Sequence, residues 1–185
     1  DIRKYNLESL RTQIGYVAQK AHMFKGSIQS NICFGKPEAS VEEMVHAATV
    51  AQASEFISTR EHGYEDEIAE DGTNISGGQK QRLSIARVIL KKPSLYIYDD
   101  SFSALDFKTD ATLRKALKPE VKNAIFFVVA QRISTIMDSD MIIVLDEGQI
   151  IGMGTHAQLL KDCSVYQEIA HSQLTQKELD DYERN

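Results

Sequence analysis

Residues 75–82 read ISGGQKQR, and this stretch decides how the rest of the chain is interpreted. Its two adjacent glycines lie between Ser76 and Gln79, whose spacing is that of a capping box at a helix start. We predict a helix from about Gly77 to Leu90, because apolar residues recur there at helical intervals. Glycines in a first turn leave backbone amides uncovered, and such a helix end attracts phosphate. A capping box alone would also satisfy this helix end, so the motif by itself leaves both interpretations open.

Polar residues also follow two short apolar runs, one on each side of this helix. A proline ends the helix, and the β-prone residues 95–98 then lead directly to two carboxylates, Asp99 and Asp100. Upstream, residues 14–18 form another β-prone run, which ends at Gln19. We therefore expect a polar site at the end of the upstream strand and acidic side chains at the end of the other.

The remaining segments alternate between helix and strand. We predict an amphipathic helix after a capping box at Ser40 and Glu43, a charged loop over 60–74, a helix over 106–117, a buried strand over 124–130, the start of a helix over 132–137, a hairpin over 141–151, and a helix from 157 that fades into a polar tail. Such alternation, with several wholly apolar strands, indicates an α/β fold with a mostly parallel sheet covered on both faces.

The composition limits the class of protein. With 185 residues, of which 42% are hydrophobic, the chain is long enough for one compact domain with a core. Its formal net charge of -6 argues against a surface built to hold phosphate backbones, so we expect no nucleic acid partner. The two cysteines lack the paired spacing of zinc sites. The apolar runs are far shorter than the roughly 20 residues that cross a bilayer.

The order of these motifs resembles the ATP-binding cassette (ABC) of ABC transporters. Residues 75–82 resemble the family's signature motif, residues 95–100 its Walker B strand, and residues 103–106, SALD, its D-loop. Gln19 lies where the Q-loop glutamine belongs, and residues 131–135, QRIST, resemble the switch region. The resemblance covers most of the chain. It implies a P-loop NTPase-like α/β fold, with a mostly parallel sheet and an α-helical signature subdomain, truncated at the N-terminus.

The resemblance implies ATP and Mg²⁺ as ligands and gives roles to single residues. Asp99 would hold Mg²⁺ through water, and Gln19 would bring an amide oxygen to the same metal. Asp100 and Gln131 would stand at the catalytic positions. The residues that would bind the nucleotide are Ser76, Gly77, Gly78, Gln79, Gln19 and Asp106. In this family two cassettes close head to tail, so the signature of one faces the ATP held by the other.

Other segments resemble exporters whose cassettes are fused to membrane segments. Residues 24–28, FKGSI, and 31–35, NICFG, look like the exporter branch, and Glu70 matches that branch's X-loop acid. The partners implied are a transmembrane domain and a second cassette on a different subunit. The resemblance also implies that the cassette lies at the cytoplasmic face of the cell membrane, where the transmembrane domain holds it. The Walker A loop is absent, because the Gly-Lys pair at 35–36 is followed by proline. We expect the chain alone to bind ATP weakly and to associate through open sheet edges.

Two positions depart from the family's pattern. Asp100 stands where the family has a catalytic glutamate, and Gln131 stands where it has a histidine. The shorter carboxylate is withdrawn by about 1 Å, and such a misplacement can cost about a hundredfold in rate. The neutral amide of Gln131 cannot become a cation beside the γ-phosphate. We therefore expect a heterodimeric exporter with two unlike ATP sites. This chain would contribute an intact signature motif to the active site, and its Asp100 and Gln131 to a second site that hydrolyses ATP poorly. The alternatives are a non-hydrolysing, nucleotide-sensing half and a soluble ABC ATPase that acts on ribosomes or DNA.

This interpretation divides the chain into four parts. Residues 1–36 would hold the Q-loop strand and the start of the helical subdomain. Residues 37–92 would hold the α-helical subdomain with the signature motif. Residues 93–160 would form the Walker B, D-loop and switch part of the ATPase core, and residues 161–185 a C-terminal helix and polar tail.

Overall fold

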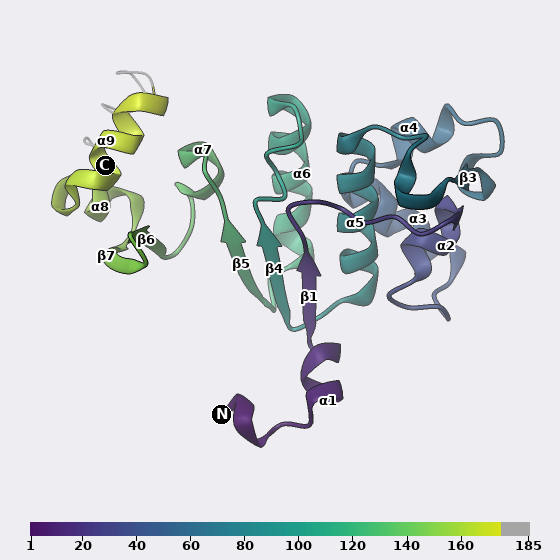
Figure 1. The fold of residues 1–185 in the computed structure, drawn as a ribbon, viewed down its shortest axis with the longest axis horizontal. Helices are drawn as coiled ribbons and strands as arrows, with labels where there is room; N and C mark the ends of the chain where they lie inside the picture. The colour runs from purple at the N-terminus through teal and green to yellow at the C-terminus, as the bar shows by residue number, and fades with distance from the viewer. Residues whose placement is uncertain (175–185) are drawn as a thin grey trace. The chain divides into compact units, whose positions relative to one another are not determined.

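A computed structural model describes residues 1–174 of the chain. The chain forms two compact units, residues 1–129 and the residues from Ala130 onward (Figure 1). Most of the predicted polar tail, residues 175–185, lies outside the described part. The four-part division expected from the sequence stays a prediction.

The first unit is an α/β structure, as the sequence predicted. Its helices and strands are, in chain order, α1 (Leu7–Thr12), β1 (Ile14–Val17), β2 (Gly26–Ser27), α2 (Ile28–Cys33), α3 (Val41–Val50), α4 (Ser54–Ser58), β3 (Glu67–Ile68), α5 (Gly77–Lys91), β4 (Leu95–Asp99), α6 (Phe107–Glu120) and β5 (Ile125–Val129). Short 3-10 helices lie at Ile2–Lys4, Gly63–Glu65 and Glu70–Gly72. Strands β1 and β4 and helix α5 lie within about one residue of the predicted segments, because strong periodicity and clear end signals bound them.

Three parallel strands form the central sheet of this unit, in the order β1-β4-β5. Val17 of β1 lies opposite Tyr98 of β4, and Tyr98 lies opposite Val128 of β5. One face of the sheet is buried in a core that also contains Leu113 and Leu117 of α6. The carboxyl ends of β1 and β4 therefore lie side by side, which places the residues that follow them together.

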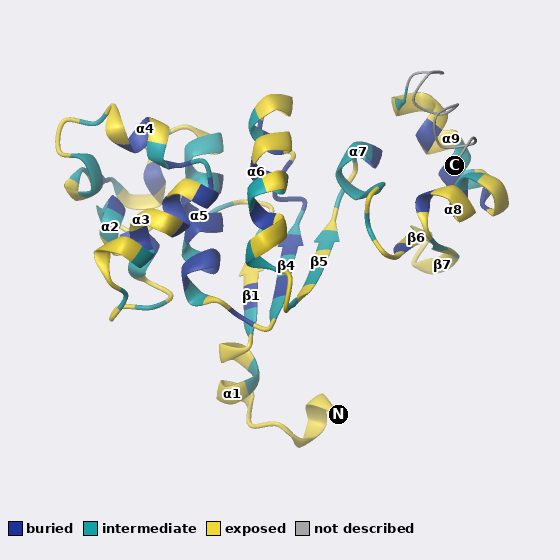
Figure 2. Cartoon of the chain, turned by 180° about the vertical axis from the view of Figure 1, so that it is seen from behind, coloured by how far each residue is buried: buried dark blue, intermediate teal, exposed yellow. Residues whose placement is uncertain are grey.

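Within the first unit, residues 1–129, no helix covers the opposite face of the sheet. Exposed apolar side chains lie on this face, namely Tyr16, Ile125, Phe127 and Val129. Figure 2 draws β5 in the colours of intermediate and exposed residues. The expectation of a sheet covered on both faces, with a buried strand at 124–130, was wrong for the described residues. Strand β5 is apolar at every position, so its sequence does not show that its side chains alternate between a half-buried and an exposed face of the sheet.

Helix α5 packs directly against β1 because position 15 carries no side chain. A Cβ atom at Gly15 would lie 2.5 Å from Cγ1 of Val88 and 2.6 Å from Cγ of Pro93, closer than real atoms approach. The buried Gln81 of α5 also donates its side-chain amide to the carbonyl oxygen of Ala18, at 3.1 Å. The helix and the end of β1 are thus held together by both packing and a hydrogen bond.

Short helices pack around α5 on the side away from the sheet (Figure 1). The capping box predicted at Ser40 and Glu43 forms at the start of α3, with both of its hydrogen bonds present. The segment 60–74, expected to be a loop, contains the short strand β3, which pairs antiparallel with β2. Two-residue strands leave no periodic pattern, so the sequence could not reveal this pairing.

The second unit has its own small core. Its elements are α7 (Ile133–Ile136), β6 (Ile142–Asp146), β7 (Gln149–Gly154), α8 (His156–Asp162) and α9 (Ser164–Gln173). Strands β6 and β7 form the predicted hairpin, and its buried residues pack against Leu159 of α8 and Tyr166 of α9. Within residues 1–174, no helix has both the length and the apolar character needed to cross a membrane.

Candidate functional site

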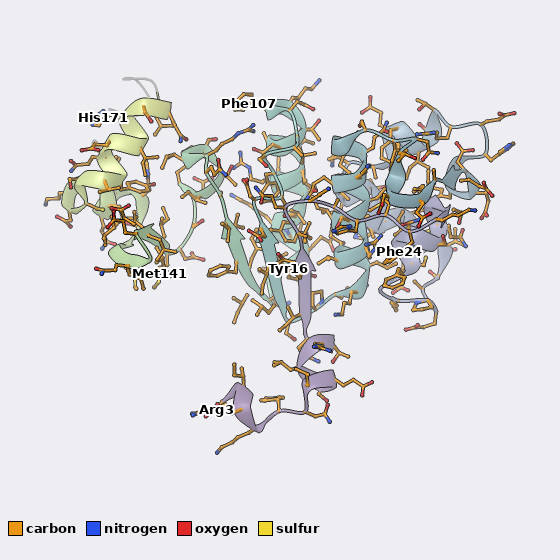
Figure 3. The ribbon with its side chains drawn as sticks, viewed as in Figure 1. Arg3, Tyr16, Phe24, Phe107, Met141 and His171 are labelled. Carbon is orange, nitrogen blue, oxygen red and sulfur yellow. The ribbon has the colours of Figure 1, made fainter. Side chains whose placement is uncertain are left out.

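The predicted metal residue Asp99 ends strand β4 on the uncovered face of the sheet. Its Oδ2 accepts a hydrogen bond of 2.8 Å from the hydroxyl of Tyr16, which projects from β1 (Figure 3). The parallel register places Tyr16 opposite Ile97, so Tyr16 and Asp99 share one face. The pKa of Tyr16 is raised from its ordinary value, first by this hydrogen bond and then by burial and by the charge of Asp99. Tyr16 is therefore a neutral donor at neutral pH.

The predicted catalytic residue Asp100 is buried directly behind the strand end, with 8% of its surface exposed. Its Oδ2 accepts a hydrogen bond of 3.0 Å from Nε2 of Gln19. The structure therefore brings together two of the predicted site residues that lie 81 positions apart in the chain. The backbone of Asp100 is left-handed, with φ of 45°, a conformation that aspartate tolerates better than most side chains.

Serine hydroxyls hold the turn that follows the two carboxylates. The buried Ser101 donates to the carbonyl oxygen of Val17 at 2.9 Å, which ties this turn to the end of β1. Ser103 donates to the carbonyl oxygen of Asp100 at 2.8 Å. The backbone amide of Asp100 donates to Val129 at 2.9 Å. The carboxylates thus sit on a turn anchored to both neighbouring strands.

The signature segment forms the start of helix α5, as predicted. Ser76 Oγ accepts from the backbone amide of Gln79 at 3.2 Å, and Gln79 Oε1 accepts from the amide of Ser76 at 3.0 Å. Both hydrogen bonds of the capping box are therefore formed, and the helix end is satisfied without a ligand. Gly77 remains exposed, and a Cβ built there would meet no atom within 4 Å. The first turn of α5 is open to an approaching anion.

Gly78 brings this helix start against the loop before α6. A Cβ atom at Gly78 would lie 3.4 Å from the carbonyl oxygen of Ala104. The next predicted site residue in that loop, Asp106, caps α6 by accepting hydrogen bonds from the amide and hydroxyl of Thr109, at 2.9 and 2.7 Å. These bonds lower the pKa of Asp106, the amide bond most strongly, so it is ionised at neutral pH. In this structure its carboxylate serves the helix cap, and its predicted contact with nucleotide stays a prediction.

Gln131, the other predicted catalytic residue, belongs to the second unit. Its side chain is exposed, and its carbonyl oxygen accepts a hydrogen bond of 2.9 Å from Nε2 of Gln173 in α9. A second bond from the backbone amide of Ile133 to Gln173 Oε1, also 2.9 Å, fixes the same segment. Gln131 is therefore held at its backbone, while its side chain faces outward.

The residues at the strand ends suit a magnesium ion that phosphates also hold. Asp99 offers a carboxylate and Gln19 an amide oxygen, and Mg²⁺ prefers oxygen ligands and keeps much of its water. Among residues 1–174, no cluster of three or more His, Cys, Asp or Glu side chains could hold a metal alone. A Mg²⁺–nucleotide complex needs only one or two protein carboxylates, so this donor set fits it.

Sequence reasoning missed three residues that build this site. Tyr16 bonds to Asp99, Ser101 anchors the turn, and Gln81 ties α5 to the residue before Gln19. The sequence held a signal for Tyr16. Side chains alternate along a strand, so once Tyr16 pairs with Ile97, Tyr16 lies on the same face of the sheet as Asp99, two positions beyond Ile97. The positions of Ser101 and Gln81 depend on tertiary contacts that a single sequence does not show.

An α/β unit with a parallel sheet, acidic strand ends and an open glycine-rich helix start defines a nucleotide-binding protein of the P-loop NTPase-like class. The ABC transporter family model matches residues 1–103, more than half of the chain. The chain therefore belongs to the ABC transporter family, and it is an ATP-binding domain of that family.

Curated relatives and a solved structure agree with this assignment. The putative multidrug export ATP-binding/permease protein YgaD of Bacillus subtilis is 46% identical over 91% of this chain and 29% of its own length. Heavy metal tolerance factor 1 of Caenorhabditis elegans is 41% identical over 96% of this chain and 22% of its own. A bacterial Atm1-family ABC exporter with ATP bound superposes with a TM-score of 0.90 at 36% identity, over 93% of this chain and 30% of that one. The chain thus spans less than a third of the length of these relatives.

Proposed function

We propose that this chain is part of the ATP-hydrolysing motor of an ABC exporter, in which closure of two cassettes around ATP drives transport across a membrane. The observation that carries the proposal is the meeting of Gln19 with Asp100, beside Asp99, at the carboxyl edge of a parallel sheet. A nucleotide held at that edge would meet an oxygen ligand for its metal and a carboxylate near its terminal phosphate. The open start of α5 would serve a nucleotide bound by a second cassette.

The partners proposed are a transmembrane domain and a second cassette carried by a different subunit. Relatives are named ATP-binding/permease proteins, and this chain matches under a third of their length. An exposed aromatic pair supports a protein partner in the exporter-like segment: Phe24 and Phe34 stack with ring centroids 4.3 Å apart. The guanidinium of Arg87 lies 5.2 and 5.7 Å from the two ring centroids and fixes their position. Through the transmembrane domain, the cassette would lie at the cytoplasmic face of the membrane.

The catalytic half of the proposal is that this chain hydrolyses ATP poorly at its own site. Asp100 is one methylene shorter than glutamate, and its Oδ2 already accepts a hydrogen bond from Gln19. Gln131 would supply a neutral amide where a cation would stabilise the transferring phosphate. The bond between Gln19 and Asp100 also favours the alternative of a nucleotide-sensing half that does not hydrolyse.

Restoring both positions in the full-length protein tests this assignment. We expect Asp100→Glu combined with Gln131→His to raise nucleotide trapping by vanadate at this chain's site about tenfold or more, because the base regains its reach. Asp162→Glu, at an exposed position of α8, is the matched control and should change nothing. Unchanged trapping in a double variant that still binds ATP would instead support the nucleotide-sensing alternative.

A further inference from the structure

The hydrogen bond between Tyr16 and Asp99 is not explained by packing of the tyrosine ring. Tyr16 is 54% exposed, so its ring is not enclosed in a core. Its hydroxyl nevertheless lies 2.8 Å from Asp99 Oδ2, a short bond to a group that carries a charge. The hydroxyl, rather than the ring, is therefore the part of Tyr16 that contributes to the site.

Both partners of this bond are held by regular structure. Tyr16 lies within β1 and Asp99 ends β4, and the two strands pair residue by residue up to Val17 and Tyr98. Ser101 adds a bond from the turn after Asp99 back to β1, at 2.9 Å. A donor placed on a paired strand keeps its position more strictly than a donor on a loop.

A donor fixed on one carboxylate oxygen limits how the carboxylate can turn. An isolated aspartate side chain rotates broadly about its last bond. With Oδ2 held by Tyr16, the direction of Oδ1 is set by the geometry of the strands. Partners of this kind, which orient a metal-binding group without touching the metal, commonly govern metal affinity.

We propose that Tyr16 is a positioning residue for Asp99, and that its hydroxyl holds Oδ2 so that Oδ1 faces the water shell of a nucleotide-bound Mg²⁺. The proposal rests on the proposed function, because it takes Asp99 to be the magnesium residue of this site. It adds a residue to that site that lies three positions before Gln19 on the same strand-and-loop segment. It requires no change in the position of either strand.

The test is a metal titration of the full-length protein, with Mn²⁺ as the probe in place of Mg²⁺ and bound Mn²⁺ measured by electron paramagnetic resonance in the presence of ATP. Tyr16→Phe keeps the ring and removes the hydroxyl. We expect it to raise the Mn²⁺ concentration for half-saturation about tenfold, the lower end of the range for lost orienting partners. ATP binding without metal should be unchanged. Tyr5→Phe, at an exposed tyrosine, is the matched control and should leave the Mn²⁺ titration unchanged.

A double variant separates this inference from the proposed function. If Tyr16 acts through Asp99, Tyr16→Phe should add no further loss of Mn²⁺ affinity to that of Asp99→Asn. A normal titration for Tyr16→Phe, together with a weakened one for Asp99→Asn, overturns the role of Tyr16 alone. A normal titration for Asp99→Asn overturns the metal assignment, and the inference with it. The thermal midpoint of Tyr16→Phe should fall by no more than a few degrees, the effect of one lost hydrogen bond, and a single cooperative transition shows that the fold is intact.

Discussion

At the scale of single residues, Asp100 shows how the site is assembled from contacts that are distant in sequence. It is buried, left-handed in its backbone, and bonded by Gln19 from another strand end. Adjacent acids after an apolar run can be recognised in a sequence, and so can a glutamine after another run. Their meeting depends on the pairing of β1 with β4, which the sequence predicted only as a common sheet. Tyr16 was not predicted as a site residue, because a tyrosine in a strand is most often part of a packed surface.

A buried histidine gives a pH dependence at the same scale. Nδ1 of His156 lies 2.7 Å from the hydroxyl of Tyr166. Burial lowers the pKa of His156 below its usual 6.5, although Asp138 raises it in part. Between the lowered pKa and 6.5, the unfolded chain binds a proton at His156 that the folded chain does not. The free energy of unfolding is therefore not reduced by this histidine above about pH 6.5, and it decreases as the pH falls below that value.

We therefore expect the thermal midpoint of the full-length protein to fall from pH 7 to pH 5, and His156→Gln to make that fall shallower. The exposed His62→Gln is the control and should keep the original pH dependence. Equal slopes for the protein and its His156→Gln variant would contradict the account.

At the scale of elements, helix α5 is a main part of the core and begins with the proposed signature motif. Eight of its side chains are buried, and its capping box was predicted from Ser76 and Gln79. Long periodic segments with caps, such as α3 and α5, are therefore well predicted from the sequence. The short elements α1, α2, α4 and β3 were not predicted, because elements of two to six residues carry no clear period.

The open first turn of α5 allows stability and function to be separated. Gly77→Ala adds a methyl group that meets no atom within 4 Å, and alanine favours helix over glycine by up to about 1 kcal/mol. We expect the thermal midpoint to stay equal or rise. In contrast, ATP-driven closure should weaken about tenfold or more, because the methyl keeps a phosphate from the exposed amides.

Closure can be measured by cross-linking this cassette to the proposed second cassette with ATP present. Ala111→Gly, at an exposed position of α6, is the reverse control: it should lower the thermal midpoint and leave closure unchanged. Normal closure in Gly77→Ala would indicate that the capping box is the only role of this motif.

At the scale of the whole molecule, the uncovered sheet face predicts how residues 1–185 behave when they are produced alone. Ile125, Phe127 and Val129 are exposed on β5, which is also an edge strand of the central sheet. Exposed apolar edge strands recruit other chains. Light scattering should therefore give a mass above that of one chain. We expect Phe127→Lys to lower that mass, whereas Phe107→Lys, on α6, should not; a monomer that binds ATP tightly would contradict the expectation.

The missing side chain of Gly15 has a consequence for the chemistry of the molecule. Helix α5 packs against the bare backbone of Gly15, and its Gln81 donates a hydrogen bond to Ala18. The distance between the side-chain amide of Gln19 and the backbone amide of Gly77 therefore depends on the absence of a side chain at position 15. A methyl group added at Gly15 would overlap Val88 and Pro93, so α5 and β1 would have to move apart, although the methyl touches neither amide. The geometry of the candidate site thus depends on a residue that takes no part in its chemistry.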